Sequence, residues 1–169
     1  IKEKDEAPVF SGNFKTLGLS GYEGTTVHAA LQDAHIEFNS DSHPTLTAGG
    51  KVELTLSGSN TVTHNSDRKS AIDIDDDGGW NNRTPGLLTI KGSGSLTATN
   101  NLSTGVRIDN GTLDVTDGTV DVTAAENGIY TIGSNTVQVS GGTLCATATS
   151  VRSIGINASN FGKVTVSGG

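Results

Sequence analysis

Three aspartates at alternate positions form the most chemically distinctive motif in the sequence. They lie in the run Asp73-Ile-Asp75-Asp-Asp77-Gly78, in which the carboxylates can converge and the glycine permits a sharp turn. The run matches the first half of a calcium-binding loop, but its twelfth position is Thr84 instead of a bidentate glutamate, so it is not an EF-hand. We therefore expect a calcium site formed by Asp73, Asp75 and Asp77, with an acidic, solvated turn as the alternative.

The residues that follow this motif combine an aromatic ring with hydrogen-bonding groups. Trp80 is the only tryptophan and is followed by Asn81, Asn82 and Arg83. An indole ring beside amide and guanidinium groups suits the stacking and hydrogen bonding that a sugar ring requires. We expect an inserted loop that carries a ligand-binding surface, whereas the alternative is that Trp80 folds back over apolar surface.

A repeat in the second half of the chain must position these residues. Rows of alternating apolar and polar residues begin at positions 88, 113, 137 and 164, and each row holds short runs separated by Gly or Asn. About 24 residues suit one turn of a right-handed parallel β-helix, in which each turn buries its inward side chains on the turn below. We therefore predict an all-β solenoid with three short strands in each turn of 24–27 residues. Its predicted inward stacks are Leu88 with Leu113, Val137 and Val164, then Leu96 with Val120 and Leu144, then Val106 with Ile129 and Ile156.

The repeat becomes less regular towards the N-terminus. We assign residues 51–169 to the β-helix, which we expect to continue beyond Gly169. Residues 11–50 are predicted to form an N-terminal cap or an irregular first turn, because terminal turns of solenoids are atypical. Residues 27–34 have weak helical character within that segment, and residues 1–10 are predicted to be a linker.

The same repeat predicts a row of side chains on the outer surface. Because neighbours on a strand point to opposite sides, the residues that follow inward Ile72, Val106, Ile129 and Ile156 must point outward. Side chains that form hydrogen bonds beside an aromatic ring again suit a sugar. The guanidinium of Arg107 in this row can pair with a uronate carboxylate or with Asp73. An ordinary solvated face is the alternative. The predicted ligand-binding residues are Trp80, Asn81, Arg83, Arg107, Tyr130 and Asn157, and the outward row also contains Asp73.

Composition excludes several classes of function. The 169 residues suit one domain, and the net charge of −7 without a Lys or Arg cluster argues against nucleic-acid binding. No apolar run approaches the ~18 residues of a membrane helix, so membrane insertion is not expected. Cys145 is the only cysteine, which excludes an internal disulfide. The low charge and the richness in Thr and Gly favour an extracellular protein.

Several rows resemble those of a known protein family. The runs Gly94-Ser-Leu-Thr-Ala-Thr, Thr119-Val-Asp-Val-Thr-Ala-Ala-Glu-Asn-Gly-Ile and Val137-Gln-Val-Ser-Gly-Gly-Thr-Leu are similar to those of bacterial surface carbohydrate-binding right-handed parallel β-helix proteins. Related rows occur in Firmicutes cell-wall adhesins, and the resemblance covers residues 52–169. It implies a right-handed β-helix, calcium bound in acidic turns, and affinity for an acidic plant polysaccharide such as polygalacturonate.

These observations favour a non-catalytic module at the bacterial cell surface. We expect it to bind a polysaccharide or host glycan on an outer face of the solenoid, with assistance from calcium. One alternative is a structural stalk or adhesin segment that binds a host surface protein. Another is a polysaccharide lyase, in which Asp73, Asp75 and Asp77 would hold calcium and Arg107 would act as the base. We expect no enzymatic activity and assign no catalytic residue.

Overall fold

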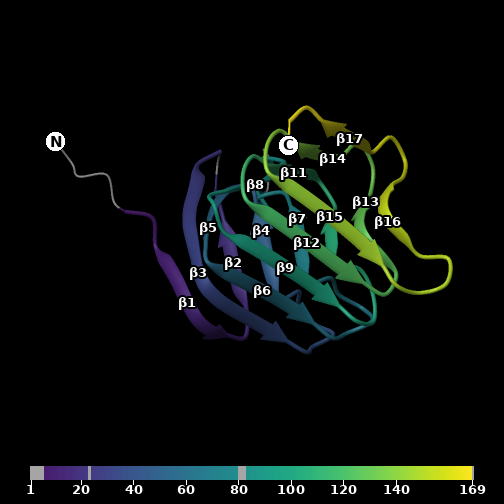
Figure 1. Ribbon diagram of the computed structural model, residues 1–169. Helices are drawn as coiled ribbons and strands as arrows, with labels where there is room; N and C mark the ends of the chain where they lie inside the picture. The colour runs from purple at the N-terminus through teal and green to yellow at the C-terminus, as the bar shows by residue number, and fades with distance from the viewer. Residues whose placement is uncertain (1–5, 23, 80–82, 169) are drawn as a thin grey trace.

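The chain folds as a β-solenoid (Figure 1). The computed structural model describes residues 6–22, 24–79 and 83–168, and within them it contains strands and no helix. Every strand pairing in these residues is parallel. The predicted parallel β-helix is therefore confirmed.

Strands at equivalent positions in successive turns form three faces. Face I is a six-stranded sheet, and faces II and III together form an 11-stranded sheet. Face I contains β2 (Leu17–Ser20), β4 (Leu46–Gly49), β7 (Ile72–Asp75), β10 (Val106–Ile108), β13 (Asn127–Thr131) and β16 (Ile154–Ala158). Face II contains β5 (Lys51–Ser57), β8 (Gly86–Lys91), β11 (Gly111–Val115), β14 (Thr136–Val139) and β17 (Lys163–Val166). Face III contains β6 (Ser59–His64), β9 (Ser95–Asn100), β12 (Thr119–Ala124) and β15 (Thr143–Ala148).

One long strand, β3 (Thr26–Phe38), connects faces II and III near the N-terminal end. Its first part pairs with β5 and its last part pairs with β6, and Asp33 lies at the bend with a φ of +50°. The expected helical character of residues 27–34 is wrong, because Ala29 and Leu31 are buried in strand-like alternation. The outermost strand, β1 (Val9–Phe14), pairs with β3 and begins within the residues that we assigned to the linker.

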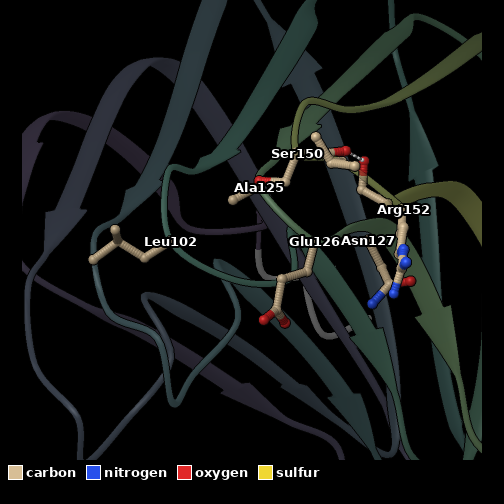
Figure 2. Close-up of a pocket in the computed structure, with 8 residues that line it drawn as sticks. Leu102, Ala125, Glu126, Asn127, Ser150 and Arg152 are labelled. Carbon is tan, nitrogen blue, oxygen red and sulfur yellow. Dashed lines mark hydrogen bonds between the residues drawn. The ribbon is translucent and has the colours of Figure 1, made fainter.

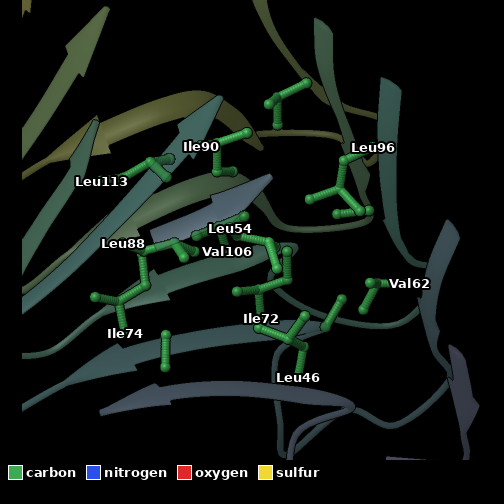
Figure 3. Close-up of a cluster of buried hydrophobic side chains, with 14 of the residues drawn as sticks. Leu46, Leu54, Val62, Ile72, Ile74, Leu88, Ile90, Leu96, Val106 and Leu113 are labelled. Carbon is green, nitrogen blue, oxygen red and sulfur yellow. The ribbon is translucent and has the colours of Figure 1, made fainter. Parts of the chain in front are cut away.

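The three predicted inward stacks form the core except at their C-terminal members, because Val164 is 46% exposed and Leu144 and Ile156 are only partly buried. Leu113 lies opposite both Leu88 and Val137 in the sheet, and each of these side chains is at most 1% exposed. The other two stacks are in register in the same way. Figure 3 shows the branched aliphatic side chains gathered in the interior between the strands. Leucine, isoleucine, valine and alanine side chains fill this narrow interior, which explains why a chain with 4% aromatic residues folds.

The core is uncovered at the C-terminal end. Leu144 and Ala146 point inward from β15 but are only half-buried, because no further strand of the described residues lies beyond them. Val166 is 72% exposed and Phe161 is 93% exposed at the same end. No helix in the described residues is long and apolar enough to cross a membrane.

Candidate functional site

The predicted outward row lies in register on face I. Arg107 lies opposite Asp73 on one side and Tyr130 on the other, and Tyr130 lies opposite Asn157. Thr47 extends the row by one strand towards the N-terminus. The side chains of these five residues are partly exposed, whereas the neighbours on either side of Asp73 and Arg107 are buried. Alternation along short strands therefore places one polar side chain on the outside of each successive turn. We call these five residues the outer row.

The charged members of the outer row have different local partners. Nε of Arg107 donates to Oδ1 of Asp109 at 2.7 Å, so the ion pair lies within one turn and not across to Asp73. This hydrogen bond raises the pKa of Arg107 above its ordinary value. Asp73 accepts a hydrogen bond from the Ser70 hydroxyl, but burial outweighs it and raises the pKa of the Asp73 carboxyl. Asp109 was not predicted from the sequence as the ion-pair partner of Arg107, although its spacing of two residues from Arg107 places both on one side of the strand.

Tyr130 and Asn157 complete the outer row. The Tyr130 hydroxyl has no hydrogen-bond partner among the residues that the structure describes, so it remains available to a ligand. Nδ2 of Asn157 donates to Oδ1 of Asn127 at 3.2 Å. This hydrogen bond connects the row to the corner at which the strands of face I begin.

The three predicted calcium ligands do not converge. Asp75 accepts a hydrogen bond from the backbone N–H of Asp76, and buried Asp77 accepts one from the N–H of Thr84 at 3.1 Å. Across residues 6–22, 24–79 and 83–168, no three acidic, His or Cys side chains gather closely enough to hold a metal ion. Asp73, Asp75 and Asp77 therefore do not fit a shared calcium site in this arrangement, and calcium binding stays a prediction.

Asp76 is not one of the three aspartates of the predicted calcium motif, but its carboxylate accepts the hydrogen bonds that hold the loop after β7. Its Oδ2 accepts hydrogen bonds from Arg83 at 3.1 Å and from Asn110 at 3.2 Å, and its Oδ1 accepts one from the N–H of Gly78. Burial raises the pKa of Asp76, but these hydrogen bonds outweigh it and hold the pKa below its ordinary value. Arg83 is thus anchored while its side chain stays 66% exposed. The two other predicted ligand-binding residues of this loop, Trp80 and Asn81, lie outside the described residues.

A pocket of about 420 Å³ lies at the corner between faces III and I. Figure 2 shows its lining on the turns that lead into β10, β13 and β16. Sequence reasoning missed this pocket, because its residues come from three turns that become neighbours only through stacking. The lining includes Leu102, Ala125, Glu126, Asn127, Ser150 and Arg152.

The comparison with protein families gives a ligand class for the chain as a whole. A family model described as carbohydrate-binding domain-containing protein matches residues 9–169. The chain belongs to this family. The match begins at the first residue of β1 and includes every strand of the solenoid. Neither the comparison with curated proteins nor that with solved structures finds a match.

Membership of the carbohydrate-binding domain family supports a carbohydrate as the partner. It also favours binding without catalysis over a lyase activity, because the family description names binding alone. Within the described residues, the outer row and the corner pocket both combine partly exposed hydrogen-bonding groups with a defined geometry.

Proposed function

We propose that the chain is a non-catalytic module that binds a polysaccharide along the outer row of face I. The observation that carries this proposal is the strict register of Asp73, Arg107, Tyr130 and Asn157 in a member of a carbohydrate-binding family. A phenol ring can contact the C–H face of a sugar while the flanking guanidinium and amide groups bind its hydroxyls.

The geometry of a solenoid suits a long polymer. Neighbouring strands lie about 4.8 Å apart, so the outer row presents one polar side chain per strand along the axis. Each contact is weak in water, but contacts to successive units of one chain add through multivalency. An extended polysaccharide is therefore a better ligand for this row than an isolated sugar.

The proposal also specifies an acidic polysaccharide, assistance from calcium and a location at the bacterial cell surface. Arg107 keeps its charge at every relevant pH, and although Asp109 occupies its Nε, its other guanidinium N–H groups can donate to a uronate carboxylate. We therefore propose an acidic polysaccharide such as polygalacturonate as the first ligand to test. Assistance from calcium and a place at the bacterial cell surface are also part of this proposal.

Retention on immobilised polygalacturonate, compared with a neutral polysaccharide, tests the proposal. Arg107→Ala and Tyr130→Ala are each expected to weaken binding about tenfold, which corresponds to about 1.4 kcal/mol. Gln138→Ala is the matched control, because Gln138 occupies an equivalent outward position on face II. It is expected to bind like the unmodified protein.

Three results would each contradict a part of the proposal. Retention that is the same for Arg107→Ala, Tyr130→Ala and Gln138→Ala would exclude the outer row as the binding surface. Release of an unsaturated product that absorbs ultraviolet light would show lyase activity instead of simple binding. A calorimetric titration with calcium alone tests the metal, and an absence of both heat and thermal stabilisation would remove calcium from the proposal.

A further inference from the structure

We infer that the corner pocket is a second saccharide subsite, which takes one neutral sugar unit. The inference rests on the proposed carbohydrate-binding function but concerns residues outside the outer row. The corner pocket has a volume of about 420 Å³, which falls within the range of about 300–1,000 Å³ that is usual for small-molecule pockets. The pocket is therefore large enough for a single sugar ring and too small for a folded partner.

The polar groups of the pocket include both donors and acceptors. Oε2 of Glu126 accepts a hydrogen bond from the Ser103 hydroxyl at 3.2 Å, which leaves Oε1 available as an acceptor. Asn127 uses its Oδ1 to accept from Asn157, so its amide N–H groups remain donors. The guanidinium of Arg152 has no ion-pair partner among the described residues. A sugar hydroxyl both donates and accepts, so adjacent hydroxyls match this combination of groups.

The charges of the pocket favour a neutral sugar over an acidic one. Its lining contains one carboxylate, from Glu126, and one guanidinium, from Arg152, and these two do not form an ion pair. The two charges offset each other, so the lining carries no net charge that would attract an acidic sugar. Leu102 is 54% exposed and Val151 is 94% exposed, which provides apolar contact for the C–H groups of a ring.

The pocket is held in shape by hydrogen bonds within and between its three turns. Asn100 accepts hydrogen bonds from the backbone N–H groups of Leu102 and Ser103, at 3.0 and 3.1 Å. The N–H of Glu126 donates to the carbonyl of Ser103, and the carbonyl of Glu126 accepts from the N–H of Ile154. Each turn is thus tied to the next by backbone groups. A preformed site costs less ordering entropy on binding than a flexible one.

The pocket and the outer row share one hydrogen bond. Asn157 belongs to the outer row and donates to Asn127, which lines the pocket (Figure 2). A glycan on the outer row can therefore extend a terminal or branching unit into the corner. This arrangement would let the protein distinguish glycans by one neutral residue as well as by the backbone of the polymer.

Nuclear magnetic resonance of the ¹⁵N-labelled full chain tests the subsite with three separate probes: D-glucose, D-galactose and D-galacturonate. At least one neutral sugar is expected to shift the amide signals of Glu126, Asn127 and residues 150–153. The Arg152→Ala variant is expected to lose these shifts. Arg68→Ala is the charge-matched control, because Arg68 is exposed and does not line the pocket, and it should retain them. Amide spectra of the free variants verify that each one folds.

The outcomes separate this inference from the proposed function. No shift at these amides with either neutral sugar, shifts that survive Arg152→Ala, or a response to galacturonate alone would each overturn the neutral subsite. If no sugar shifts the amide signals of the pocket while Tyr130→Ala still reduces polysaccharide retention, the proposed function stands and the subsite is wrong. If neutral sugars shift the pocket amides in Tyr130→Ala as well, the subsite stands whatever the outer row binds.

Discussion

Asn100 shows how one buried side chain fixes a turn of this solenoid. Its Nδ2 donates to the carbonyls of Lys69 and Thr104, at 2.7 and 3.1 Å, and its Oδ1 accepts from the N–H groups of Leu102 and Ser103. The side chain is fully buried, so water cannot replace these bonds when the amide is removed. Four backbone groups therefore depend on one residue.

We predict that Asn100→Ala lowers the free energy of unfolding by about 2–4 kcal/mol, because it leaves buried donors and acceptors unpaired. Urea unfolding followed by circular dichroism measures the change. Asn101→Ala is the matched control, since Asn101 is exposed and its side chain makes a single hydrogen bond among the described residues, to Asn65. Its expected cost is below about 1 kcal/mol. Equal losses in the two variants would contradict the assigned role of Asn100.

Because burial raises the pKa of Asp73, its ionised carboxyl is expected to lower the stability of the fold at neutral pH. Burial raises its pKa, so the folded state binds the proton more tightly than the unfolded chain does. The stability that protonation contributes is present at acid pH and is lost as the pH rises through the folded pKa. Asp73→Asn removes the buried charge, and its side-chain oxygen can still accept from Ser70.

We therefore predict a higher melting temperature for Asp73→Asn than for the unmodified protein at pH 7. The difference should disappear as the pH falls towards about 4, the ordinary pKa of an aspartate. Differential scanning calorimetry across this range measures it. Asp114→Asn is the control, because Asp114 on face II is partly exposed and also accepts a serine hydroxyl, from Ser140. A lower melting temperature for Asp73→Asn at pH 7 would show that its attraction to Arg107 outweighs burial.

At the residue scale, strand alternation made the residues of the outer row predictable, but it did not predict their hydrogen-bond partners. The register of Arg107 with Tyr130 follows from a repeat that is visible in the sequence. The hydrogen bonds of Asp76 could not be predicted, because they depend on how the loop after β7 returns to Arg83 and Asn110. The same alternating motif that indicated calcium gives carboxylates that accept bonds from their own loop.

At the element scale, glycines permit close packing where one face turns into the next. Gly111 lies opposite Gly86 in the sheet, and a Cβ at position 111 would lie 2.1 Å from the backbone oxygen of Gly86. The backbone cannot move away without breaking the parallel ladder between β8 and β11. Glycine is needed here for close approach and not for a positive φ.

We predict that Gly111→Ala destabilises the fold by about 2–4 kcal/mol through this backbone clash. Gly18→Ala is the control, since a Cβ at Gly18 meets no atom within 4 Å and the residue does not have a positive φ. Its expected effect on the urea midpoint is within about 0.5 kcal/mol of zero. A tolerated Gly111→Ala would mean that the corner between β7 and β8 can relax.

The elements were predictable wherever turns separate them in the sequence. From position 88 onwards, Gly and Asn mark the end of each short strand, so the three stacks could be assigned in register. Residues 26–38 lack such a break, because β3 continues from one face to the next through Asp33. The run Ala29-Ala-Leu31 therefore gave weak helical character to residues that pair as a strand.

At the scale of the whole molecule, the two ends of the solenoid differ. The edges of β15, β16 and β17 are unpaired among the described strands, and Val166 and Phe161 are strongly exposed beside them. Unpaired strand edges together with exposed apolar side chains promote association between chains. A polypeptide of these 169 residues is therefore expected to self-associate through this end as its concentration rises.

We predict that Val166→Lys reduces this self-association, because a charge on an open strand edge opposes pairing with another chain. Sedimentation velocity over a range of concentrations measures the average mass. Leu102→Lys is the control, since Leu102 is exposed at a corner and not on a strand edge. A concentration-dependent mass that both substitutions leave unchanged would exclude the C-terminal edges as the contact.

The continuity of β3 has a consequence for how the solenoid opens locally. β3 is the only described strand that belongs to two faces, and it is paired with β1 on one side and with β5 and β6 on the other. Separating the whole of β3 from the sheet requires that its pairing be lost on both faces, whereas β15 and β17 can open singly. Amide protons in the pairings of β3 with β5 and β6 should therefore exchange more slowly than those of β15 and β17.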